Sequence, residues 1–125
     1  REIFSQKLFE IIDEKNYNEF VLLASFDPAL IKIIKQNRNS ILACIINNPY
    51  ENKLPYELIA ETNADGVICS IEELSDEFIA DIERNNIPVG VYDVDSEEQL
   101  IRCRNAGVVG IGTNFPQRIL NKLKK

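Results

Sequence analysis

Residues 87–116, IPVGVYDVDSEEQLIRCRNAGVVGIGTNFP, are predicted to form a strand, a helix, a second strand and the start of another helix. Residues 89–94 are apolar and rich in β-branched side chains, which is typical of a short strand buried on both faces. Residues 108–113 have the same character and predict a second strand. Because a helical segment separates the two strands, we expect them to be parallel.

The ends of that intervening helix carry recognisable signals. Asp95, followed by Glu98 three residues later, predicts an N-terminal cap with a reciprocal carboxylate. The helix is expected to run to Ala106, after which Gly107 supplies the left-handed residue that ends it. Pro116 then opens another helix, where its missing N–H costs little.

The rest of the chain repeats this unit, with five predicted strands and six predicted helices in alternation. The strands are expected at residues 20–25, 40–46, 65–69, 89–94 and 108–113. The helices are expected at residues 1–15, 28–37, 55–63, 76–85, 96–106 and 116–124. Residues 47–53 and 70–74 are expected to be loops, and the last helix ends in the lysines Lys122, Lys124 and Lys125.

This alternation predicts an α/β fold with a parallel sheet in a single domain, residues 1–125. Two architectures share the pattern: part of a (β/α)8 barrel of the TIM type, and an open, doubly wound sheet. The pattern alone does not choose between them. Sequential strand neighbours would indicate the barrel, and a reversal of strand order would indicate the open sheet.

Composition excludes several classes of protein. The apolar fraction of 45% is ordinary for a globular chain, and no apolar run approaches the ~18 residues that span a bilayer. The net charge of −6 argues against a nucleic-acid interface, which needs a basic face. A small phosphorylated ligand stays possible, because helix ends bind phosphate whatever the net charge.

The three cysteines, Cys44, Cys69 and Cys103, are an odd number without metal-like spacing. We interpret them as buried apolar side chains. Their number mildly favours a reducing compartment, and hence the cytoplasm.

Polar residues at the predicted strand ends are candidates for a site, because function gathers there in α/β proteins. Gly110, Gly112, Thr113 and Asn114 would let a phosphate approach the backbone. The alternative is that Gly112 only relieves packing and Asn114 caps the last helix.

Carboxylates also follow the predicted strands. Asp93 and Asp95 would share one face of a strand, with Glu72 and Glu73 in a neighbouring loop, and such a group could hold a divalent cation. The alternative is a cap and two solvated charges. The chain has no histidine, which excludes imidazole acid–base catalysis by this chain.

Three segments carry a family resemblance. Residues 91–95 read VYDVD, residues 107–116 read GVVGIGTNFP and residues 22–28 read LLASFDP. They resemble the glycerophosphodiester phosphodiesterase family, whose last strands read roughly V-W-T-V-N and G-V-D-G-I-I-T-D-x-P, and which has a Ser-Phe strand end. The resemblance implies a partial (β/α)8 TIM-type barrel of five parallel strands, corresponding to the last five strands of the family.

The resemblance also implies a reaction: hydrolysis of glycerophosphodiesters to an alcohol and glycerol 3-phosphate. The family uses two histidines and a divalent cation (Ca²⁺ or Mg²⁺) held by carboxylates of its first three strands. We therefore predict no catalytic residue, no metal ligand and no cofactor in this chain, which should be inactive alone. The resemblance implies that this chain lines the substrate pocket around a small phosphodiester. The lining residues would be Ser25, Phe26, Tyr92, Thr113 and Asn114.

Some positions depart from the family pattern. Asn114 and Val109 stand where the family has aspartate, Asp93 replaces a threonine, and Tyr92 replaces a tryptophan. These departures leave open an alternative function, that of a catalytically silent relative acting as a binding or assembly module. Five strands cannot close an eight-stranded barrel, so we expect either that upstream strands complete it or that two chains associate across the open edges.

Overall fold

The computed structural model describes residues 1–124, in which five parallel strands alternate with helices. The strands are β1 (Leu22–Ser25), β2 (Leu42–Ile46), β3 (Gly66–Ser70), β4 (Val89–Tyr92) and β5 (Gly110–Ile111). The helices are α1 (Glu2–Lys15), α2 (Pro28–Asn37), α3 (Pro55–Thr62), η1 (Ile71–Glu73, a 3-10 turn), α4 (Asp76–Asn85), α5 (Glu97–Asn105) and α6 (Pro116–Leu123). No helix among these residues is both long enough and apolar enough to cross a bilayer.

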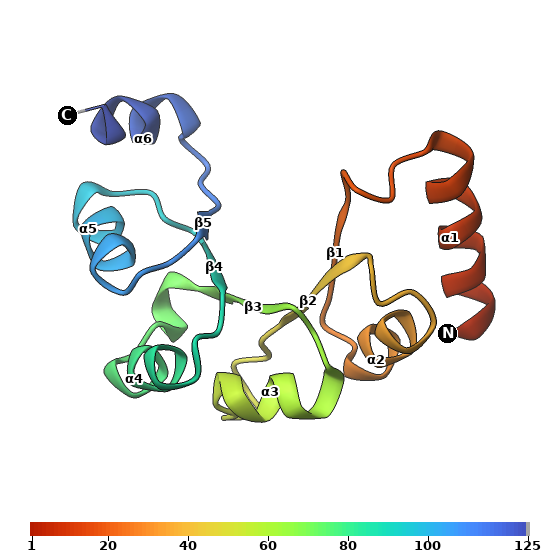
Figure 1. Ribbon diagram of the computed structural model, residues 1–125. Helices are drawn as coiled ribbons and strands as arrows, with labels where there is room; N and C mark the ends of the chain where they lie inside the picture. The colour runs from red at the N-terminus through yellow and green to blue at the C-terminus, as the bar shows by residue number, and fades with distance from the viewer. Residues whose placement is uncertain (125) are drawn as a thin grey trace.

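The strands form one sheet in the order β1-β2-β3-β4-β5, and every neighbouring pair is parallel. The strands form an arc, with the helices arranged around its outer side and the inner side left open (Figure 1). Sequential neighbours with helices on one face are the arrangement of a (β/α)8 barrel. The prediction of a partial barrel is confirmed, and the open, doubly wound sheet is wrong because the strand order never reverses.

The hydrophobic core lies between the sheet and the helices. Side chains alternate along each strand, and the outward set is buried against helix residues such as Ile31, Ile34, Phe78 and Ile82. This outward set comprises Ala43, Ile45, Val67, Cys69, Val89 and Val91. The inward set is more exposed, with Leu22 at 54% and Leu42 at 52%. The concave face is therefore the accessible face of the sheet.

Local signals place most helix ends where the sequence predicts them. The Asp27 carboxylate accepts a hydrogen bond from Ala29 N at 3.1 Å, and the Ser75 hydroxyl accepts one from Phe78 N at 3.1 Å. Gly107 has a φ of 74°, the left-handed conformation expected after α5. Lys125, the last of the three lysines predicted at the end of α6, lies outside the described residues.

The predicted cap of α5 is wrong by one residue. Ser96 occupies the N-cap, accepting from Gln99 N, and the Gln99 side chain accepts from Ser96 N in return. Asp95 is unavailable as a cap because its carboxylate accepts hydrogen bonds from the loop after β5.

The last two strands are shorter than predicted, and one predicted loop contains a turn of helix. β4 ends at Tyr92 because Asp93 takes a left-handed φ of 64°, which breaks the extended backbone. β5 consists of Gly110–Ile111 only, whereas the sequence predicts a strand over residues 108–113. The 3-10 turn η1 falls inside the predicted loop 70–74.

Candidate functional site

The carboxyl ends of the strands meet at one edge of the sheet, where the predicted site residues lie. Phe26 follows β1 directly, and its side chain is 58% exposed. Tyr92 ends β4 in register with Ser70 at the end of β3, and both are half-buried. Phe26 and Tyr92 thus supply accessible aromatic surface at this edge.

Ser25 is placed differently from its neighbour. It lies in register with Ile45, a residue buried under the helices, so it belongs to the outward set of strand residues. Its hydroxyl accepts a hydrogen bond from Asp27 N at 3.0 Å. Ser25 therefore supports the turn that carries Phe26 and opens α2.

Tyr92 packs against the loop after β5. A Cβ added at Gly112 would lie 3.3 Å from Tyr92 Cβ, closer than most real contacts, so a larger residue there would require Tyr92 to shift by a few tenths of an ångström. This supports the packing interpretation of Gly112. Burial raises the pKa of the Tyr92 hydroxyl, and the carboxylates of Glu73 and Asp93 raise it further.

Thr113 and Asn114, whose hydrogen-bond donors were predicted to bind a phosphate, donate to the Asp95 carboxylate instead. Its Oδ1 accepts from Thr113 Oγ1 and from Asn114 N, both at 2.9 Å, and its Oδ2 accepts from Asn114 Nδ2 at 3.2 Å. The Asn114 N–H and then the Thr113 hydroxyl lower the pKa of the Asp95 carboxyl. Asn114 is not the helix cap of the alternative interpretation, because Phe115 holds that position.

Two polar side chains that sequence reasoning placed near the strand ends, but did not pair with each other, meet at the ends of β2 and β3. Glu73 accepts from Asn47 Nδ2 at 2.6 Å and from Ser70 N at 2.7 Å. Asn47 is only 6% exposed, and its Oδ1 has no hydrogen-bond partner. The spacing of Ser70 and Glu73 is that of a capping box, which could have indicated that Glu73 is engaged with Ser70 and is not a free carboxylate. The pairing of Glu73 with Asn47 is a tertiary contact that no sequence signal marks.

The predicted carboxylate group does not form a metal centre. Asp93 and Asp95 do not share a strand face, because the strand ends at Tyr92 and Asp93 is left-handed. Among residues 1–124 no three His, Cys, Asp or Glu side chains are grouped as metal ligands, so this donor set does not fit a divalent cation. The cysteines are buried and unpaired as predicted, and burial raises the pKa of Cys69 to about 12. They are poor nucleophiles in this state.

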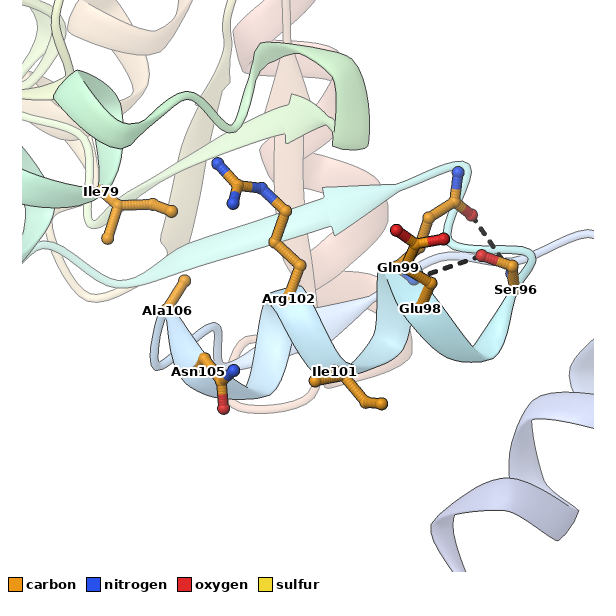
Figure 2. Close-up of a pocket in the computed structure, with 8 residues that line it drawn as sticks. All are labelled: Ile79, Ser96, Glu98, Gln99, Ile101, Arg102, Asn105 and Ala106. Carbon is orange, nitrogen blue, oxygen red and sulfur yellow. Dashed lines mark hydrogen bonds between the residues drawn. The ribbon is translucent and has the colours of Figure 1, made fainter.

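A separate hollow lies on the outer surface between α4 and α5. It has a volume of about 690 Å³, and Figure 2 shows Ile79 of α4 facing the side chains of α5. The Arg102 guanidinium in this pocket donates to Leu74 O at 2.6 Å and thereby ties α5 to the start of α4. None of the predicted site residues lines it.

Known proteins match the chain over almost its whole length. The model of the glycerophosphoryl diester phosphodiesterase family matches residues 3–118. A curated glycerophosphodiester phosphodiesterase from Caldanaerobacter subterraneus subsp. tengcongensis is 24% identical over 122 residues, which cover 96% of this chain and 49% of the relative. The chain thus spans about half the length of that relative.

Solved structures of other proteins have the same fold as this chain. A glycerophosphodiester phosphodiesterase from Parabacteroides distasonis superposes with a TM-score of 0.78 at 16% identity, over 97% of this chain and 51% of that one. An Oleispira antarctica phosphodiesterase, solved with the product sn-glycerol-3-phosphate, superposes with a TM-score of 0.71 at 15% identity, over 83% of this chain and 42% of that one. With the family match over residues 3–118, these likenesses identify the chain as a member of the glycerophosphoryl diester phosphodiesterase family.

Proposed function

We propose that this chain supplies scaffold and substrate-pocket wall to a barrel that hydrolyses glycerophosphodiesters to an alcohol and glycerol 3-phosphate. The family membership and the relative named glycerophosphodiester phosphodiesterase support this reaction class. The product bound to the Oleispira antarctica phosphodiesterase supports a ligand of the glycerol phosphate type.

The observation that carries the proposal is the accessible aromatic surface at the carboxyl ends of the strands. Barrel enzymes bind substrate at that end. Phe26 and Tyr92 would cover the carbon skeleton of the ligand, and an amphipathic ring such as tyrosine suits a glycerol moiety. Ser25 would hold the Phe26 turn, while Thr113 and Asn114 would form the adjoining wall, fixed from behind by Asp95.

The reacting groups belong to the rest of the barrel in this proposal. The chain has no histidine, and its described carboxylates do not form a metal site, so the divalent cation, Ca²⁺ or Mg²⁺, takes its ligands outside these residues. The isolated chain should therefore be inactive.

A chimera tests the proposal. The matching segment of the Caldanaerobacter enzyme is replaced by residues 1–125, and glycerophosphodiester hydrolysis is measured with Ca²⁺ or Mg²⁺. We expect turnover by the folded chimera and none by the isolated chain. Metal-dependent turnover by the isolated chain, or a folded chimera without turnover, would contradict the proposal.

A second candidate function is a non-catalytic module that assembles through its sheet edges. β1 and β5 each pair on one side only, and apolar side chains are exposed beside them: Phe20 at 81% and Val109 at 74%. Unpaired edges with apolar neighbours promote association. Light scattering at micromolar concentration should then report oligomers of the 125-residue chain, and a monomer would count against this function.

A further inference from the structure

The loop after β5 is joined to the end of β4 through one side chain. Residues 112–115 connect the two-residue strand β5 to α6. Among residues 1–124, each side-chain hydrogen bond between this loop and the rest of the chain ends on Asp95. Its Oδ1 accepts from Thr113 Oγ1 and Asn114 N, and its Oδ2 accepts from Asn114 Nδ2. Asp95 therefore connects the ends of the two strands.

The elements on either side of this loop contribute little to its position. β5 pairs with β4 only at Gly110 and Ile111, so the ladder ends before the loop begins. At the other end, the N-cap residue of α6, Phe115, makes no side-chain cap bond. The position of residues 112–114 consequently depends on Asp95 and on the backbone contacts of Gly112.

Gly112 brings the loop against Tyr92. The Gly112 N–H donates to Val91 O at 2.7 Å, and the Gly112 carbonyl accepts from Val94 N at 3.0 Å, so the two bonds flank Tyr92. A Cβ added at Gly112 would lie 3.3 Å from Tyr92 Cβ and 3.5 Å from Tyr92 Cα. Because close-packed groups transmit displacements, a shift of the loop moves the base of the Tyr92 side chain.

We propose that Asp95 is a positioning residue of the substrate pocket: it holds residues 112–114 against Tyr92 and thereby fixes the ring that covers the ligand. The inference deepens the proposed function and rests on it. Asp95 acts through the loop and not on the ligand, since both of its oxygens already accept hydrogen bonds. A contribution of this kind changes the affinity for the ligand and leaves the reacting groups of the barrel unaffected.

The test uses the chimera in which residues 1–125 replace the matching segment of the Caldanaerobacter enzyme. Asp95→Ala removes all three bonds and should raise KM for a glycerophosphodiester about fivefold, with kcat near the parent value. Asp95→Asn keeps an Oδ1 acceptor for Thr113 Oγ1 and Asn114 N, so its KM should stay near the parent value. Equal increases in KM for the two variants would show that the charge matters and not the bonds, and would overturn the inference.

Asp93→Asn is the matched control for charge. It removes an exposed carboxylate two residues away, and asparagine tolerates the left-handed φ of 64° at this position. Both KM and kcat should stay at the parent values. An increase in KM as large as that of Asp95→Ala would show a general electrostatic effect on the ligand and would also overturn the inference.

A double-mutant cycle shows whether Asp95 acts through Tyr92. In a Tyr92→Ala chimera the ring to be positioned is absent, so the addition of Asp95→Ala should raise KM further by less than about twofold. A further increase equal to the effect of Asp95→Ala alone would mean that the two residues contribute independently, which would contradict the proposal.

A measurement without turnover separates this inference from the proposed reaction. The chain has no tryptophan, and Tyr17, Tyr50 and Tyr56 are exposed, so their replacement by phenylalanine leaves Tyr92 as the only tyrosine. In this 125-residue chain, Asp95→Ala should increase the quenching of Tyr92 fluorescence by acrylamide. Unchanged quenching in a variant that is folded by circular dichroism would overturn the inference. An inactive chimera with increased quenching would refute the proposed hydrolysis and leave the link between Asp95 and Tyr92 standing.

A second variant covers the case in which Asp95→Ala does not fold. Thr113→Val keeps the shape of the side chain and removes the hydroxyl that donates to Asp95 Oδ1. It should increase the quenching of Tyr92 in the same direction but to a smaller extent, because two of the three bonds remain. No change in quenching for a folded Thr113→Val chain would contradict the proposal.

Discussion

Asp95 shows how one side chain fixes a loop at the candidate site. It joins the end of β4 to Thr113 and Asn114 after β5 through three hydrogen bonds. A sequence reading assigns Asp95 to the helix cap, because Asp95 and Ser96 both suit that position and local spacing does not separate them. The partner eighteen or nineteen residues away is a tertiary contact that local rules do not contain.

The lowered pKa of Asp95 predicts a pH dependence of stability. A carboxyl whose pKa is lower in the folded state stabilises the fold above its unfolded pKa of about 3.9, and this contribution is lost as pH falls through the folded pKa. Asp95→Asn should therefore lose less stability than the parent chain on acidification. Urea unfolding from neutral to acid pH checks this, and parallel curves for the two proteins would contradict it.

Lys35 is the most consequential buried charge. Its side chain is 3% exposed, and its Nζ donates to Asp65 Oδ2 at 2.7 Å and to the carbonyls of Asn39 and Ile41. Lys35→Met leaves the carbonyls of Asn39 and Ile41 without this donor and the Asp65 carboxylate without its cation, although Ala43 N still donates to Asp65 Oδ2. We expect the substitution to lower the free energy of unfolding by about 3 kcal/mol. The exposed Lys32→Met should change it by about 0.5 kcal/mol or less, as measured by chemical denaturation. Equal effects would refute the role assigned to Lys35.

At the scale of elements, hydrophobic runs and helix-start signals predict the five strands and six of the seven helical segments that residues 1–124 form. The boundaries of β4 and β5 are less predictable. The sequence predicts that the strand extends to the apolar Val94, but the left-handed Asp93 ends the ladder at Tyr92. The backbone conformation of a single residue is not encoded in hydrophobicity. The turn η1 was missed because three residues are too short for any periodicity.

Two strand glycines make a matched test of packing between elements. A Cβ at Gly66 would lie 2.8 Å from Pro88 O, a backbone atom that cannot move aside easily, whereas nothing lies within 4 Å of a Cβ at Gly110. Gly66→Ala should therefore destabilise the chain by about 1–3 kcal/mol, while Gly110→Ala should be nearly neutral. Thermal unfolding followed by circular dichroism ranks the two, and the reverse order would show that the β3–β4 contact is misplaced.

For the whole molecule, alternation of strands and helices predicts a parallel sheet but not its closure. The choice between barrel and open sheet came from the resemblance of residues 91–95 and 107–116 to a family, and the sequential strand order settles it. The concave face, with Leu22 and Leu42 exposed, follows from that order because helices cover only the convex side (Figure 1). Of the candidate site, the positions of Phe26 and Tyr92 at the strand ends were predictable, whereas the Asn47–Glu73 pair depended on tertiary contact.

In the proposed function, this chain lines the pocket and does not carry the reacting groups. The kinetics of Tyr92→Ala in the chimeric barrel test it most directly, with the exposed Tyr56→Ala on α3 as the control. We expect Tyr92→Ala to raise KM for a glycerophosphodiester while kcat stays near the parent value, and Tyr56→Ala to change neither. A collapse of kcat at unchanged KM, or no effect of Tyr92→Ala at all, would contradict it.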